Sequence, residues 1–180
     1  MNDQASSAVL DRALELLSTH DLRDISVDHL SEASGVPSFD IIREFRSRER
    51  ILEAVLNREA KLLVASLPPF ENDLPALANA LIRGCQTRLP LLRRLLSEAS
   101  RDKRVAALIH ETFIGPLQWL LESFFRDEKN TSRKREDVQL AARLFLNALV
   151  GSLIMREVFG GEVEARQLCD AFLHRASMNS

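Results

Sequence analysis

The sequence predicts an all-α fold with about nine helices, because of its apolar spacing and its punctuation. Apolar residues recur at every third or fourth position through most of the chain, which is the period of helices with one buried face. Most prolines and glycines fall between these stretches. No run of alternating polar and apolar residues indicates a strand.

The first two helices are expected in the N-terminal part of the chain. The apolar face of the first consists of Val9, Leu10, Ala13, Leu16 and Leu17. Ser26 can cap a second, short helix. The inner face of that helix would be Val27, Leu30 and Ala33.

A tight turn and a third short helix should follow. Gly35 supplies the left-handed backbone position that a turn between two helices needs. Pro37 fits the start of the third helix, with Ile41 and Phe45 as its core anchors. Two short helices across a glycine-containing turn form a helix-turn-helix unit, whose second helix normally enters the major groove of DNA. The segment therefore predicts a DNA-binding head.

The remaining helix boundaries follow from proline, glycine and polar residues. Helices are expected over about 47–67, 73–89, 90–101, 102–127, 136–159 and 162–176. Pro116 should kink or split the helix over 102–127.

The composition is that of an ordinary globular protein: 180 residues, 46% hydrophobic, 28% charged, with a net charge of −2. This net charge argues against a protein surface that is basic overall and binds nucleic acid along its whole extent. Cys85 and Cys169 lie in helical patterns and are expected to be reduced, buried thiols. The N-terminus, MNDQASSAVL, lacks the layout of a signal peptide, so a cytoplasmic location is expected.

Motifs of enzymes and of cofactor sites are absent from the sequence. It contains no glycine-rich phosphate loop, no HExxH, no paired-cysteine spacing and no Gly-x-Ser-x-Gly. His110 and Glu111 are adjacent on a helix and point apart, so they do not indicate a metal site. We expect no enzymatic activity, no cofactor and no metal.

The N-terminal third contains a recognisable pattern. Residues 25–36 read ISVDHLSEASGV, Phe45 follows, and residues 47–52 read SRERIL. In this pattern the chain resembles the TetR family of transcriptional regulators. The resemblance implies a DNA-binding domain over 1–47 and a ligand-sensing and dimerisation domain over 48–180. It implies a homodimeric repressor that binds an inverted-repeat DNA operator and is released by a small-molecule effector, without a membrane.

The resemblance places the DNA contacts on and around the third helix. The candidates are Ser26, Ser38, Phe39, Asp40, Ile42, Arg43, Arg46 and Arg48. Arg48 occupies the family's basic position and should hold phosphate. Arg43 could bind a guanine edge, or Arg43, Arg46 and Arg50 could pair with Glu44, Glu49 and Glu53. Asp40 could accept a hydrogen bond from cytosine or simply stabilise the helix start.

The head also departs from the family. Family members commonly carry a small residue and an aromatic, usually tyrosine, where this chain has Phe39, Asp40 and Ile42, and this chain contains no tyrosine. Over residues 1–58 acidic side chains outnumber arginines and lysine is absent. Phosphate neutralisation supplies most non-specific affinity, so the head should hold DNA weakly. The alternative is a degenerate head that acts through another protein, as an antirepressor does.

The helix expected over 136–159 is apolar on nearly every side between Leu140 and Met155, so it must be buried on every side. Arg143 and Asn147 interrupt the run and argue against a membrane span. A second subunit could cover one face, as in the four-helix dimer interface of the family, whereas the alternative is a hairpin within one chain. The candidate interface residues are Ala141, Leu144, Ala148, Gly151, Ser152, Leu168 and Phe172.

A ligand pocket, if present, should lie among the helices between residues 73 and 159. An apolar, aromatic-rich cavity with a few polar groups suits a small molecule, although most such residues in a helical bundle are core. The candidates are Arg83, Gln86, His110, Phe113, Ile114, Trp119, Phe124, Phe145 and Met155.

Overall fold

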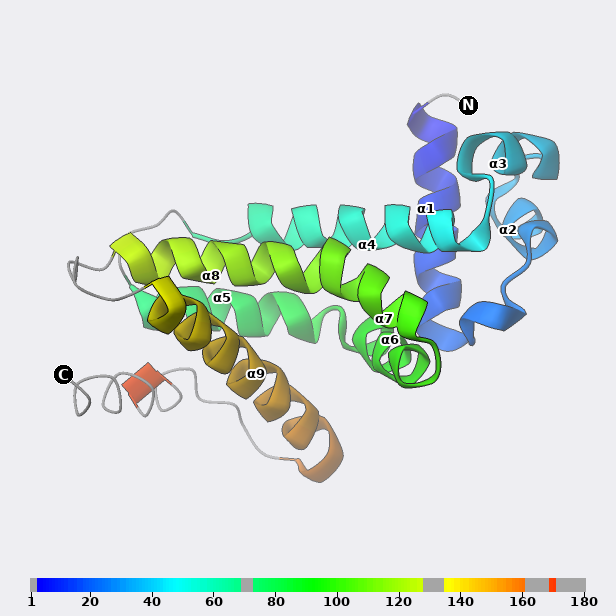
Figure 1. Ribbon diagram of the computed structural model, residues 1–180. Helices are drawn as coiled ribbons and strands as arrows, with labels where there is room; N and C mark the ends of the chain where they lie inside the picture. The colour runs from blue at the N-terminus through cyan, green and yellow to red at the C-terminus, as the bar shows by residue number, and fades with distance from the viewer. Residues whose placement is uncertain (1–2, 69–72, 128–134, 161–168, 171–180) are drawn as a thin grey trace. The chain divides into compact units, whose positions relative to one another are not determined.

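The computed structural model describes residues 3–68, 73–127, 135–160 and 169–170. Its α-helices are α1 Asp3–Thr19, α2 Val27–Ser34, α3 Ser38–Phe45, α4 Arg48–Ala65, α5 Leu74–Gln86, α6 Leu89–Arg101, α7 Lys103–Ile109, α8 Gly115–Asp127 and α9 Arg135–Phe159 (Figure 1). A short 3₁₀ turn, η1, spans Leu22–Asp24. The described residues contain no strand, which confirms the all-α prediction.

The helix predicted over 102–127 is split, as expected from Pro116. The π-helical turn η2, His110–Ile114, separates α7 from α8. Pro116 has no N–H to donate, and its ring crowds the carbonyl of Thr112 four residues earlier. The helix predicted over 162–176 lies outside the described residues, apart from Cys169 and Asp170.

The chain forms two compact units. Unit 1 comprises Met1–Lys61 and Arg88–Ile114, and unit 2 comprises Leu62–Thr87 and Gly115–Ser180. The start of α4, α6 and α7 thus belong with α1–α3 in one compact body. The compact units do not divide at residue 47, so the boundary between a DNA-binding domain and a sensing domain stays a prediction.

The core of unit 1 is a continuous apolar cluster drawn from all of its α-helices. Helix α1 contributes Val9, Ala13 and Leu17, and it packs against both α2 and α6. The other helices contribute Leu30, Ile41, Ile51, Leu52, Val55, Leu56, Leu91, Leu95 and Val105. Removing this apolar surface from water is the main favourable term in the folding of unit 1.

The sequence prediction for the inner face of α2 was partly wrong. Leu30 is buried, but Ala33 is exposed. A residue four positions after Leu30 lies on the same helix face, so Ser34 points inward instead and is half-buried. The Ser34 hydroxyl donates to the carbonyl oxygen of Leu30 at 2.5 Å, which satisfies the polar atom.

A buried ionic group also links the elements of unit 1. Glu59 of α4 is buried, and its Oε2 lies 3.0 Å from Nε of Arg88 at the start of α6. Arg58 lies 3.7 Å from the other oxygen of Glu59 and reaches Asp11 of α1 at 2.8 Å. Because an unpaired charge is costly in a core, the group favours one arrangement of the three helices.

In unit 2, α8 and α9 pack side by side, and α5 also contacts α9 (Figure 1). The Phe125 ring makes edge-on contacts with Phe124 and Phe145, with centroid distances of 5.8 Å and 5.9 Å. Cys85 and Cys169 are buried and are not joined in a disulfide, as predicted. Burial raises the pKa of the Cys169 thiol to about 11, so it stays protonated at neutral pH.

Helices α4 and α5 approach each other closely at Gly84. A β-carbon at Gly84 would overlap Cδ1 of Leu63, which is fully buried. Gly84→Ala should therefore lower the free energy of unfolding by about 1–3 kcal/mol through overpacking, measured by urea denaturation. In a Leu63→Ala background the same change should cost little, because the obstructing atom is gone. An equal penalty in both backgrounds would contradict this steric account.

Candidate nucleic-acid interface

The turn between α2 and α3 has the geometry that the sequence predicts. The backbone N–H of His29 donates to Oγ of Ser26 at 3.1 Å, which makes Ser26 the N-cap of α2. Gly35 closes the helix with φ of 70°, in the left-handed region. Pro37 precedes the first residue of α3. Residues 26–45 therefore form a helix-turn-helix unit.

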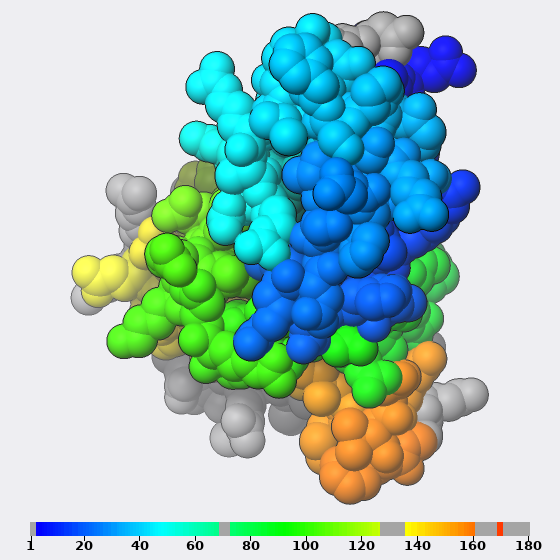
Figure 2. All heavy atoms as spheres, turned by 90° about the vertical axis from the view of Figure 1, so that its right-hand side faces the viewer, coloured from blue at the N-terminus to red at the C-terminus, as the bar shows by residue number. Residues whose placement is uncertain are grey.

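The outer face of α3 is exposed and carries two large apolar side chains. Ile41 is buried, whereas Phe39 is 71% and Ile42 53% exposed. Helices α2 and α3, in blue to light blue, face the viewer in Figure 2. The face of α3 that a groove would meet is thus open to solvent and more apolar than a phosphate-binding surface usually is.

Asp40 and Arg43 form an ion pair on this outer face. Nη2 of Arg43 lies 2.7 Å from Oδ1 of Asp40, and its guanidinium carbon is 5.7 Å from the centroid of the Phe39 ring. The sequence offers Glu44 as a partner of Arg43, but this pair is made with Asp40. A pair this exposed contributes only about 0–1 kcal/mol, so a phosphate or base could displace the aspartate.

The second positive group lies at the start of α4. Nη1 of Arg48 donates to the carbonyl oxygen of Arg23 at 2.8 Å, which ties α4 to η1. Arg50 pairs with Glu53 at 2.7 Å, as the sequence analysis suggested. The pKa of Glu49 is lowered, first by a hydrogen bond from its own backbone N–H and then by the Ser47 hydroxyl.

Ser38, at the start of α3, makes a contact within the head. Its hydroxyl donates to Oδ1 of Asp28 in α2 at 3.0 Å, so it links the two helices of the motif. Ser26 likewise has a structural role as the cap of α2. Both side chains can contribute to a DNA contact only in addition to these roles.

The turn from α3 to α4 contains a strained residue that sequence reasoning missed. Arg46 has φ of 65° and ψ of −37°, and the N–H of Ser47 donates to the carbonyl oxygen of Phe45 at 2.7 Å. This is a γ-turn with positive φ, which is rare and strained for a residue with a β-carbon. No glycine marks this position, so the positive φ could not be predicted from the sequence.

The predicted pocket residues do not form one group. His110, Phe113 and Ile114 belong to unit 1 and the other candidates to unit 2. The buried members are Phe113, Phe124 and Phe145, whereas Arg83, His110, Trp119 and Met155 are exposed. Exposed side chains do not line an enclosed cavity within a single chain, because they face solvent. A ligand role for any of the nine residues stays a prediction.

Helix α9 is apolar on two sides, and the described residues cover only one of them. Val138, Ala142, Phe145, Leu149 and Leu153 are buried against the rest of unit 2. The opposite side exposes Leu140, Leu144, Met155, Val158 and Phe159, and we call these five residues the α9 stripe. Ala148 is exposed, while Ala141, Gly151 and Ser152 are half-buried. Leu168 and Phe172 lie outside the described residues.

By length and composition alone, Glu136–Phe159 could cross a membrane, with a mean hydropathy of 1.6. A helix with one face in the core of a non-membrane protein passes the same test. Arg143 and Asn147 are both exposed on this helix.

Comparison with solved structures identifies the fold. The chain is similar to the flavonoid-responsive regulator FrrA, with 19% identity, coverage of 96% of this chain and 95% of the other, and a TM-score of 0.78. Salmonella enterica GusR gives 18% identity, coverages of 94% and 93%, and a TM-score of 0.78. A TetR-family transcriptional regulator from Streptomyces coelicolor has 14% identity to this chain, with coverage of 96% of this chain and 80% of the other, and a TM-score of 0.73.

No protein-family model matches the chain, and no curated protein sequence matches it. The chain has the fold of the TetR-family transcriptional regulators over nearly its whole length. The resemblance seen in residues 25–52 is thereby confirmed for the fold.

The strained turn makes a testable prediction. Arg46→Gly should raise the free energy of unfolding relative to Arg46→Ala by about 1 kcal/mol, because glycine adopts positive φ without strain. Both variants remove the same charge, so the comparison isolates the backbone effect in urea denaturation. At a position without strain, glycine would lower the free energy of unfolding relative to alanine. A free energy of unfolding for Arg46→Ala that equals or exceeds that of Arg46→Gly would therefore refute the strain.

Proposed function

We propose that this chain is a TetR-type DNA-binding transcriptional regulator, a dimeric repressor in the cytoplasm that binds an inverted-repeat operator. The observation that carries the proposal is the helix-turn-helix unit of residues 26–45, with the outer face of α3 open to solvent. Release by a small-molecule effector is part of the same proposal, supported by the fold and by the likeness to a regulator described as flavonoid-responsive.

In the proposed complex, α3 enters the major groove. Arg43 then exchanges Asp40 for a base edge or a phosphate, since its ion pair is exposed and weak. Arg48 and the N-terminus of α4 hold the phosphate backbone, and Arg46 adds charge beside them. Few positive groups face the DNA, so binding should depend on salt less steeply than binding by a strongly basic regulator.

The proposed dimer is formed through the α9 stripe. An exposed row of large apolar side chains along one helix marks an interaction surface. Ala148 and Gly151 lie on the same helix and would let a partner helix approach closely. A two-fold axis through this helix pairs two heads, which is the arrangement that an inverted repeat requires.

The operator prediction follows from this symmetry. Selection from random duplexes at low salt should recover inverted repeats whose half-site centres are about 34–36 Å apart, or a multiple of that. Arg48→Ala should weaken binding to all sequences alike, whereas Arg43→Ala should also relax base preference. Arg126→Ala, an exposed arginine of α8, is the control and should have no effect. A footprint over one unpaired half-site would argue against the symmetric complex.

The dimer prediction is tested on the α9 stripe itself. Leu144→Glu, or Gly151→Asp beside it, should give monomer or aggregate in sedimentation, because a dimer interface cannot bury an unpaired carboxylate cheaply. Leu96→Glu changes a leucine of α6 that is exposed to the same extent, and it should leave the dimer intact. A folded wild-type monomer at micromolar concentration would rule out the proposed interface.

A second candidate function rests on the exposed pair Phe39 and Ile42. These two apolar side chains, with Asp40 already neutralising Arg43, suit a protein surface better than a phosphate backbone. In this case the head binds another protein, as an antirepressor does, and no longer reads DNA. The wild type would then select no operator from any duplex pool.

The double variant Asp40→Thr with Ile42→Tyr distinguishes the two functions. Ile42 is exposed and Asp40 is half-buried, so neither belongs to the core and the fold should tolerate the change. If the head reads DNA, removing the carboxylate and adding a hydroxyl should raise general DNA affinity, measured by fluorescence anisotropy with a non-specific duplex. An unchanged or lower affinity, in a folded dimer, would favour the protein-binding function.

A further inference from the structure

Unit 1 contains an open cavity of about 730 Å³ between the first turns of α4 and the segment formed by the end of α6 and α7. Leu22, Val105 and Leu108 contribute apolar side chains to its walls. In Figure 2 the start of α4 (cyan) and α7 (green) lie next to each other on the left of the view. The residues predicted from sequence to hold a ligand do not line this cavity.

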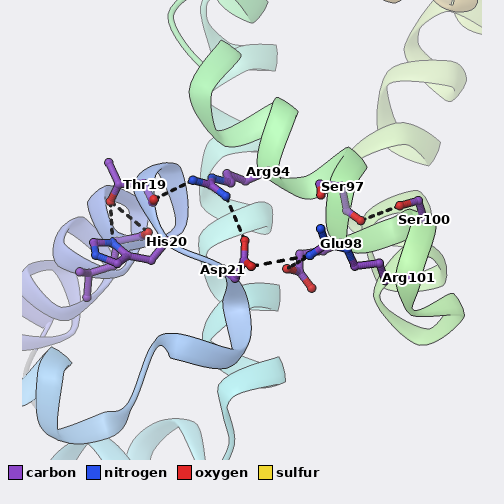
Figure 3. Close-up of polar contacts among 9 residues, drawn as sticks. Thr19, His20, Asp21, Arg94, Ser97, Glu98, Ser100 and Arg101 are labelled. Atoms are coloured by element: carbon purple, nitrogen blue, oxygen red, sulfur yellow. Dashed lines mark hydrogen bonds and ion pairs between the residues drawn. The ribbon is translucent and has the colours of Figure 1, made fainter.

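Glu98 of α6 lies in the wall of this cavity and is only 9% exposed. Its Oε1 is buried and accepts no hydrogen bond from the described residues. The nearest cation is Arg101, whose Nη1 is 3.9 Å away and lies nearer to Asp21, at 3.6 Å (Figure 3). A buried carboxylate oxygen without a donor is costly, so this position favours a donor that enters from the cavity.

The wall carries equal numbers of arginines and carboxylates, so its selectivity depends on Glu98. The arginines are Arg23, Arg48, Arg50, Arg101 and Arg104, and the acids are Glu49, Glu53, Glu98, Asp102 and Glu111. Three of these arginines are already engaged within unit 1. The contacts are Arg50 with Glu53 at 2.7 Å, Arg104 with Asp102 at 3.1 Å, and Arg48 with the carbonyl oxygen of Arg23 at 2.8 Å. Glu49 and Glu111 add negative charge to this wall, and Arg23 and Arg101 add positive charge. Beside Glu98, an ammonium group meets a carboxylate oxygen without a donor, whereas a carboxylate would meet a like charge.

We propose that this cavity binds a small molecule with a protonated amine at one end and an apolar body. The ammonium donates to the carboxylate of Glu98, whose buried oxygen reaches the cavity when the carboxylate turns about its terminal torsion. The apolar body lies against Val105 and Leu108. The site is formed within unit 1, so its occupancy requires neither DNA nor the α9 stripe, and its test is independent of the proposed function.

Phenethylammonium is a suitable probe, titrated into the full-length protein and followed by calorimetry and by backbone amide shifts. We expect saturable binding, with the shifts centred on residues 22–23, 47–53 and 98–111. The neutral 2-phenylethanol and the anionic 3-phenylpropionate should bind at least about tenfold more weakly, because they lack the charge-assisted bond to Glu98. Glu98→Gln should lower the affinity for phenethylammonium by a similar factor, whereas Glu122→Gln on α8 should not change it.

Several results would overturn the proposal. The absence of saturable phenethylammonium binding at millimolar concentration would exclude an amine site. An affinity for phenethylammonium no higher than that for 2-phenylethanol would exclude it as well. Shifts centred on α5, α8 or α9 would place the binding elsewhere in the chain. These measurements need only the wild type, so they decide the question even if Glu98→Gln does not fold. A folded Glu98→Gln protein with unchanged affinity would also contradict the role of Glu98.

Discussion

The helix-turn-helix unit depends on apolar burial that it cannot complete from its own residues. Helix α1 presents one side to α2 and another to α6, and Leu91 and Leu95 of α6 belong to the same buried cluster as Leu17. Small helical units have little core of their own, so such a shared cluster decides whether they are stable. The head and the α6–α7 segment therefore form one body, unit 1.

Polar contacts at the edge of this cluster fix the turn that follows α1. Arg94 of α6 donates to the carbonyl oxygen of Thr19 and to Oδ1 of Asp21, both at 2.9 Å (Figure 3). Arg101 approaches the other oxygen of Asp21 at 3.6 Å. From there η1 leads to the carbonyl of Arg23, which holds Arg48. A ligand next to Glu98 would lie beside these contacts, so its binding and the position of the first turn of α4 can be coupled.

The features that the sequence predicted well are local. Ser26, Gly35 and Pro37 define the turn through caps and backbone preferences that act within a few residues. Pro116 splits a helix because of its own missing N–H. The resemblance in residues 25–52 was specific enough to give the fold, although identities to the solved structures are below one fifth.

The features that the sequence did not predict depend on residues distant in the chain or on competing partners. Apolar spacing shows that a face is buried but not against which helix, so the association of α6 with α1 was not visible. Arg43 has acidic neighbours on both sides in the sequence. The pair with Asp40 has a spacing of three residues, one of the two spacings, three or four, at which side chains meet on a helix. The strained turn at Arg46 could not be predicted, because glycine is the usual sign of a positive φ and this position holds an arginine.

The most direct test of this account is amide hydrogen exchange on the full-length Leu95→Ala variant. Leu95 is buried in the shared cluster, so the truncation should cost about 2–5 kcal/mol. If the head and α6 are one cooperative body, the amides of α1 and α2 should lose as much protection as those of α6. Leu96→Ala, an exposed neighbour, should leave all of them unchanged. Loss of protection in α6 alone, with α1 and α2 at wild-type levels, would contradict the account.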